Sequence, residues 1–229
     1  MGIPYSTFYA KFLSQNGIAI PLDDAIALCT DVRSALISAD IIGFRSFRTN
    51  ERTMIRERIE QGDAYSALGF LYARELLQQG LIEGYWQQAT ITSAWIHLDM
   101  TPYLEKILDG ADSIIVITGR AELRDAFGSR AGSRLEAFIT VPVQGFTPQS
   151  SDQSHFFSAF PIVRRELGQK NLRGKLVLVG AGLFGKVYCH TAKQDGAVAI
   201  DLGSAFDILA GLETRPVHKW YDISAMRWI

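Results

Sequence analysis

Residues 174–207 place a strand, a glycine turn, a helix and a second strand in one short stretch, GKLVLVGAGLFGKVYCHTAKQDGAVAIDLGSAFD. The apolar run Leu176–Val179 predicts a buried strand, and Ala197–Ile200 predicts the second strand, which ends at Asp201. Three glycines between them have the G-x-G-x-x-G spacing: Gly180, Gly182 and Gly185. Glycines let the backbone approach a ligand closely, and the first N–H groups of the helix point at anionic oxygens. The stretch predicts an α/β fold that binds a phosphorylated ligand, although the same glycines would also permit a tight turn and close helix–strand packing.

The position of Asp201 relative to the glycines fits a dinucleotide fingerprint, in which an acidic residue follows at a distance of about 20 residues. An NAD(P)-binding oxidoreductase is therefore one hypothesis. Against it, little sequence follows Asp201 to supply the remaining strands of a dinucleotide domain, and no constellation for hydride transfer is identifiable.

The residues after the second strand are more distinctive. Asp201 and Asp207 stand at the two ends of a strand-to-helix turn that contains Gly203 and Ser204. With the GAGLFGK turn at 180–186, the IDLGSAFD block at 200–207 and the TRP triplet at 214–216, the chain resembles the GT-D-type glycosyltransferases. These are bacterial enzymes with a Rossmann-like fold that move a sugar from a nucleoside diphosphate to an acceptor. Upstream, the strand Ala39–Phe44 and the segment Val141–Pro142 resemble the family more loosely.

This resemblance implies a nucleoside-diphosphate sugar as donor and a glycan, a glycolipid or a protein-linked glycan as acceptor, as in polysaccharide biosynthesis. Glycosyl transfer needs a cradle and a countercharge for the diphosphate and, in inverting enzymes, a base for the acceptor's proton. Candidates for nucleotide binding are Gly180, Gly182, Gly185, Lys186, Gly203, Ser204 and Arg120. Candidates for catalysis are Asp207, Asp201, His97 and Asp40.

The best-described branch of the family carries an Asp-x-Glu motif after an early strand, where it binds metal and nucleotide. Neither Asp-x-Glu nor Asp-x-Asp occurs in this sequence, and Asp40 lies nearest to the corresponding position. Asp40 is therefore the candidate for a divalent metal such as Mn²⁺ or Mg²⁺, and metal dependence is left open. A noncatalytic nucleotide-binding protein is a third hypothesis, because the motif is missing.

Composition narrows the class of protein. The chain has 229 residues, of which 48% are hydrophobic and 21% charged, so a substantial core can form. A net charge of -1 gives no general attraction for nucleic acid or for an anionic membrane. No apolar run reaches the roughly 18 residues that suggest a membrane span. We expect a cytoplasmic protein, or one bound peripherally to the inner face of the membrane; the sequence indicates no oligomeric state.

The pattern along the chain predicts a mostly helical first third followed by alternating strands and helices. Expected helices in the first third are Thr7–Ser14, Asp23–Ile37, Glu51–Glu60 and Asp63–Gln79; expected strands are Asp40–Phe44, Ile91–Leu98, Ser113–Thr118 and Glu136–Val141. The predicted fold is a Rossmann-like, mostly parallel sheet with flanking helices. We expect one domain over residues 1–229, with a helical part at 1–38 and an α/β core at 39–229, or alternatively two small lobes.

Three smaller features complete the predictions. His97 and Asp99 are expected at the end of the strand Ile91–Leu98, where the two side chains together are a candidate for the general base. Arg130 and Arg134 flank Gly132 in an expected mobile loop. The segment 142–154 is expected to be a long irregular loop, and the helix after it opens with aromatic residues suited to core packing or to stacking on a base or sugar: His155, Phe156, Phe157 and Phe160.

Overall fold

The computed structural model describes residues 21–44, 55–57, 59–62, 71, 74–75, 77–143, 155–215, 217–218 and 221–229. They form two compact units, the first reaching Ile96 and the second beginning at His97. The expected helix Thr7–Ser14 lies outside the described residues, as do residues 144–154 of the expected loop. The expected helices Glu51–Glu60 and Asp63–Gln79 are described only in part. That the chain forms a single domain stays a prediction.

In the first unit, a helix and two short parallel strands pack around one tryptophan. Helix α2 (Leu22–Ile37) confirms the expected helix, and strand β1 (Ile41–Phe44) pairs in parallel with β2 (Thr90–Ser93). Trp86 is buried, its Nε1 donates to the Leu36 carbonyl oxygen at 3.0 Å, and its ring meets the edge of Phe44. This tryptophan therefore links the end of α2 to the sheet.

The prediction that His97 and Asp99 end a strand is wrong. Strand β2 stops at Ser93, whose Oγ accepts a hydrogen bond from the Trp95 N–H at 3.1 Å and turns the chain. Helix α5 (Ile96–Met100) follows and carries both residues. The strand is short because its partner, β1, offers only four residues for pairing.

The second unit is built on a four-stranded parallel sheet with the order β4-β3-β5-β6. Its strands are β3 (Ile114–Thr118), β4 (Leu135–Thr140), β5 (Leu176–Gly180) and β6 (Val198–Asp201). Its helices after α5 are α6 (Leu104–Asp109), α7 (Arg124–Ala131), α8 (Phe160–Gln169), α9 (Gly182–Gln194) and α10 (Ala205–Leu209). Shorter 3₁₀ turns are η1 (Thr101–Tyr103), η2 (Ala121–Leu123), η3 (Gly132–Arg134) and η7 (Ile223–Met226), and a π-helical turn, η5 (His155–Ala159), precedes α8.

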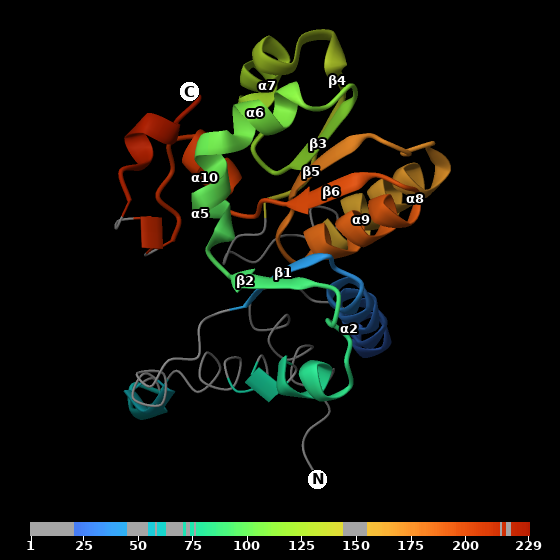
Figure 1. The fold of residues 1–229 in the computed structure, drawn as a ribbon, viewed down its shortest axis with the longest axis vertical. Helices are drawn as coiled ribbons and strands as arrows, with labels where there is room; N and C mark the ends of the chain where they lie inside the picture. Colours follow the sequence, from blue (N-terminus) through green and yellow to red (C-terminus); the bar gives the residue numbers. More distant parts are fainter. Residues whose placement is uncertain are drawn as a thin grey trace. The chain divides into compact units, whose positions relative to one another are not determined.

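Both faces of this sheet are covered by helices (Figure 1). The apolar strands β3 and β5 are the central pair, as expected for strands buried on both sides. One face packs against α6, α7 and α10 in a core that includes Leu108, Val116, Phe127, Leu178 and Phe206. Helices α8 and α9 pack together on the opposite face, where a Cβ on Gly185 of α9 would meet Val179 of β5.

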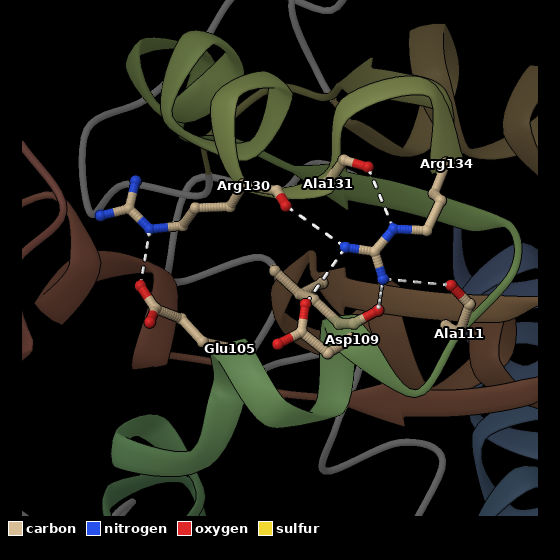
Figure 2. Close-up of polar contacts among 7 residues, drawn as sticks. Glu105, Asp109, Ala111, Arg130, Ala131 and Arg134 are labelled. Carbon is tan, nitrogen blue, oxygen red and sulfur yellow. Dashed lines mark hydrogen bonds and ion pairs between the residues drawn. The ribbon is translucent and has the colours of Figure 1, made fainter.

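Arg130 and Arg134 do not lie in a loose loop, so that prediction is wrong. Arg130 is in the last turn of α7, and Gly132, with φ of 58°, ends this helix before η3. The Arg134 guanidinium donates to the carbonyl oxygens of Ala131, Leu108, Ala111 and Arg130 and to Asp109 (Figure 2). Its charge and hydrogen bonds stabilise the carboxyl ends of α6 and α7, where unpaired carbonyl groups collect.

The predicted fold class is confirmed: helices flank parallel strands, and a helical region precedes them. The structure divides the parallel strands between two sheets, whereas the sequence suggested one. Among the described residues, no helix is long and apolar enough to cross a membrane.

Candidate functional site

The carboxyl ends of β3 and β5 form a topological switch point. The connection from β3 leads to β4 on one side, and the connection from β5 leads to β6 on the other. Thr118 and Gly180, the last residues of the two strands, are register partners, so the segments after them leave from adjacent positions. Ligands of open α/β sheets bind in the crevice at such a point. Here it brings together Arg120 and the glycine turn, both expected in the site.

Arg120 is held by Asp207 of α10. Its Nε donates to Asp207 Oδ1 at 2.7 Å, and only 20% and 16% of the two side chains are exposed. The other carboxylate oxygen, Oδ2, accepts a hydrogen bond from Thr214 Oγ1. Among the described residues, the Nη groups of Arg120 have no hydrogen-bond partner. The carboxylate therefore fixes the guanidinium while leaving its terminal donors for another group.

The three glycines of the turn each have a structural reason to lack a side chain. A Cβ on Gly180 would overlap the ring of Phe206, which lies in the buried core. Gly182 has φ of 57°, a conformation that side chains disfavour, and a Cβ on Gly185 would lie 3.2 Å from Val179 and 3.3 Å from Asp201. Close packing thus accounts for Gly180 and Gly185, while the exposed Gly182 opens α9, whose first N–H groups are available for a ligand.

Lys186 and Asp201 form a second ion pair beside this turn. Lys186 Nζ lies 2.9 Å from Asp201 Oδ2, while Asp201 Oδ1 accepts the Gly203 N–H at 3.1 Å. The negative charge of Asp201 raises the pKa of Lys186, although burial opposes it. Both carboxylate oxygens of Asp201 are therefore engaged by the chain itself.

His97 and Ser204 meet although they are far apart in the sequence. His97 Nε2 lies 3.1 Å from Ser204 Oγ, in the turn between β6 and α10. Helix α5 is anchored beneath this contact, because Thr101 Oγ1 donates to the His97 carbonyl oxygen at 2.6 Å. Both residues were predicted as site residues, but their contact was not.

Two residues of this region were not predicted as site residues, Thr214 and His218. Thr214 binds Asp207, and the ring of His218 lies 5.9 Å from the ring of His97, edge to face. His218 is fully buried, which lowers its pKa, while the charge of Asp207 acts in the opposite direction. No local pattern marks His218 as a site residue; only the packing of the chain brings it to His97.

The contacts above are all within the second unit and do not involve Asp40. It belongs to the first unit, where it is exposed and precedes β1, so it lies at the amino end of its strand. Among the described residues, no group of three or more His, Cys, Asp or Glu side chains could hold a metal ion. Whether the protein depends on a divalent metal stays open, as does the role of Asp40.

Comparison with known proteins gives one family. No curated protein and no solved structure matches the chain. A family model described as the GT-D fold-like domain matches residues 5–209, which include the glycine turn, Arg120 and the block 200–207. The match ends before Thr214 and His218. Since it spans most of the sequence, the chain belongs to the family of GT-D fold-like domains.

Proposed function

We propose that this protein is a glycosyltransferase that moves a sugar from a nucleoside-diphosphate sugar to a hydroxyl group of a glycan, glycolipid or protein-linked glycan. Membership of the GT-D fold-like family supports a fold of the glycosyltransferase type. The observation that carries the proposal is Arg120: a guanidinium fixed through Nε by Asp207 at the switch point, beside the first turn of α9.

Arg120 suits a leaving diphosphate. An arginine held by one carboxylate can use its remaining donors on phosphate oxygens in a bidentate manner. The N–H groups at the start of α9 add donors from the neighbouring strand end. In this arrangement Asp207 positions Arg120, and Asp201 positions Lys186 as a second positive charge. Histidine is the most frequent general base in enzymes, and we assign the proton-accepting role to His97.

In this proposal the sugar is transferred between Arg120, which holds the diphosphate, and His97, which accepts the proton. The bond between the anomeric carbon and the diphosphate oxygen breaks, and the acceptor oxygen forms the new bond to that carbon. The acceptor's proton passes to the His97 imidazole, which Ser204 Oγ orients through Nε2. Arg120 and the α9 N–H groups balance the negative charge that develops on the leaving diphosphate.

An oxidoreductase has less support. In a dinucleotide fold the acid after the second strand binds the ribose hydroxyls. Here Asp201 is occupied by Lys186 and by the Gly203 N–H. A noncatalytic nucleotide-binding protein would share the diphosphate contacts but would release no diphosphate from a nucleotide sugar.

Thermal unfolding with UDP, GDP, their sugars and NADH, each with and without Mn²⁺, tests the proposal. A ligand at about 100 times its Kd adds roughly 2.7 kcal/mol, which corresponds to roughly 5–11 °C in a domain of this size. We expect a shift with a nucleoside diphosphate or its sugar and none with NADH. Release of diphosphate in the presence of an acceptor then separates an enzyme from a binding protein.

Two arginine variants test whether the thermal shift with a nucleotide depends on Arg120. Arg120→Met should abolish most of the nucleotide shift, because the countercharge is lost. Arg173→Met removes the same charge from the exposed loop before β5, at the opposite edge of the sheet, and should leave the shift unchanged. A shift that survives Arg120→Met, or one produced by NADH alone, would overturn the proposal.

A further inference from the structure

His218 has a feature that the proposed function does not yet use. It is fully buried, and neither Nδ1 nor Nε2 has a hydrogen-bond partner of normal geometry among the described residues, although the backbone of Leu212 interacts with the ring and raises its pKa. Leaving a buried polar atom unpaired costs about 1–3 kcal/mol, and buried polar atoms in proteins nearly always have a partner. A polar group from outside the chain would complete these hydrogen bonds.

The surroundings of His218 belong to the candidate site. Its ring lies edge to face with His97, at 5.9 Å between centroids and 68° between planes, and His97 in turn contacts Ser204. The negative charge of Asp207, the partner of Arg120, acts on His218 as well. An external group that reaches His218 would therefore lie next to both the proposed base and the residue that positions the countercharge.

His155 provides a contrast within the same unit. It is also buried, but its Nε2 lies 2.9 Å from Tyr188 Oη, and its ring packs on Phe184 at 4.3 Å. One of its nitrogens thus has a partner within the chain, in an aromatic cluster. Nδ1 has no partner of normal geometry among the described residues in either histidine, so the two differ at Nε2, which is paired in His155 and unpaired in His218.

The chemistry of a neutral imidazole selects the ligand group. Burial lowers the pKa of His218 below its ordinary value, which favours the neutral ring. A neutral imidazole offers one N–H donor and one acceptor nitrogen. A hydroxyl group both donates and accepts, whereas an ionised phosphate only accepts, so the ring is better matched to a hydroxyl.

We propose that His218 binds a hydroxyl group of the donor sugar, beside the His97–Ser204 contact. This inference rests on the proposed glycosyltransferase function. The donor sugar is bonded to the diphosphate, which that function places at Arg120, and Arg120 is held by the same Asp207 whose charge acts on His218. His218 lies beyond residue 209, so it would be a contribution of this chain's C-terminal segment to the site.

Calorimetric titration of two ligands tests the assignment. From UDP-glucose, UDP-N-acetylglucosamine and GDP-mannose, the one that binds the wild-type protein most tightly is compared with its own nucleoside diphosphate. We expect His218→Phe to weaken binding of the nucleotide sugar roughly tenfold and to change binding of the diphosphate less than about twofold. His218→Asn, which keeps a donor and an acceptor, should restore much of the affinity. His190→Phe makes the same chemical change in α9 and should affect neither ligand.

Equal affinities of wild type and His218→Phe for the nucleotide sugar would overturn the assignment, as would an equal loss for both ligands, which indicates general damage. Thermal unfolding adds an independent readout. If an ordered water only completes the hydrogen bonds of His218, His218→Phe lowers the unfolding midpoint without changing the ratio of affinities. Failure of the wild-type protein to bind any of these nucleotide sugars would instead overturn the proposed function, and this inference with it.

Discussion

Arg120 and Arg134 are two arginines of the same unit, with similar exposure, 20% and 29% of their side chains. All five N–H donors of Arg134 have acceptors in the chain, four of which are backbone carbonyl oxygens. Arg120 uses its Nε on Asp207, and its Nη groups have no partner among the described residues. The two guanidinium groups therefore differ in the number of N–H donors that remain available to a ligand.

The surroundings of the two arginines distinguish a structural charge from a charge that can bind a ligand. Arg134 lies where α6 and α7 end, and its hydrogen bonds are consumed in holding those ends together (Figure 2). Arg120 lies at the carboxyl ends of β3 and β5, where ligands of parallel sheets bind. An arginine whose N–H donors all have acceptors within the chain stabilises the fold. An arginine that the chain holds by one donor can bind a ligand with the others.

The largest expected effect is on stability, from Arg134→Met. It leaves several carbonyl groups without their partner and should lower the free energy of unfolding by about 2–4 kcal/mol. Arg120→Met should cost less, about 1–2 kcal/mol, because Thr214 still donates to Asp207. Urea denaturation of both variants measures the difference.

Glu105→Gln is the matched control for this measurement. It breaks the ion pair with Arg130, in which Glu105 is 65% exposed, and surface pairs contribute about 0.2–1 kcal/mol. If Arg120→Met proves at least as destabilising as Arg134→Met, the distinction between the two arginines fails.

Gly180→Ala tests whether the glycine turn is shaped by packing. The added Cβ would overlap the Phe206 ring, so the free energy of unfolding should fall by roughly 1–3 kcal/mol. Phe206→Leu in the same chain should recover part of this loss. In α7, a Cβ on Gly128 would meet nothing within 4 Å, so Gly128→Ala should leave stability unchanged or raise it. A stable Gly180→Ala protein would contradict the packing role.

Acid should destabilise the protein through His155, which is buried and bonds to Tyr188 Oη through Nε2. Burial lowers its folded-state pKa to about 4, whereas an unfolded histidine titrates near its ordinary value of about 6.5. The unfolded state therefore binds more protons between these values, and stability falls as pH falls through that window. The expected loss is about 1 kcal/mol between pH 7 and pH 5.5.

His155→Gln isolates this contribution, since the amide can still bond to Tyr188 Oη. Urea denaturation at several pH values should give a variant whose stability depends less on pH than that of the wild type. Parallel curves for the two proteins would show that His155 titrates normally in the folded state.

The features that a local sequence pattern determines could be predicted from the sequence. The run Leu176–Val179, the glycines and the end of β6 at Asp201 lie within one continuous stretch, so the β5–α9–β6 unit could be placed from spacing alone. Strands β3 and β4 were predicted for the same reason, because each is a short apolar run bounded by polar or glycine residues.

Contacts that depend on strand order could not be predicted in this way. Arg120 and Asp207 are 87 residues apart, and His97 and Ser204 are 107 apart. Both contacts require that the chain pass from β4 back across β3 to β5. The end of α7 at Gly132 did have a local signal, a glycine preceded by the basic residue Arg130, which is typical of a helix terminus rather than of a mobile loop.

The smallest expected effect comes from Glu136, whose carboxylate, like Arg134, is satisfied within the chain. Lys175 Nζ and Ser113 Oγ both bond to Glu136 Oε2, and these hydrogen bonds lower its pKa below the ordinary value. The stabilisation is therefore present above the unfolded pKa and is lost as pH falls through the lower folded pKa. Because the glutamate is 36% exposed, we expect only about 0.5 kcal/mol.

Glu136→Gln should reduce stability by this amount at pH 7 and should match the wild type in acid, where both side chains are uncharged. High salt should shrink the difference at pH 7, because it screens exposed charges. A saturating nucleoside diphosphate should leave the difference unchanged, since Glu136 begins β4 and lies at the amino edge of the sheet, away from Arg120. If the nucleotide instead removes the difference, charges at the two edges are coupled, and the separation between structural and binding charges would be wrong.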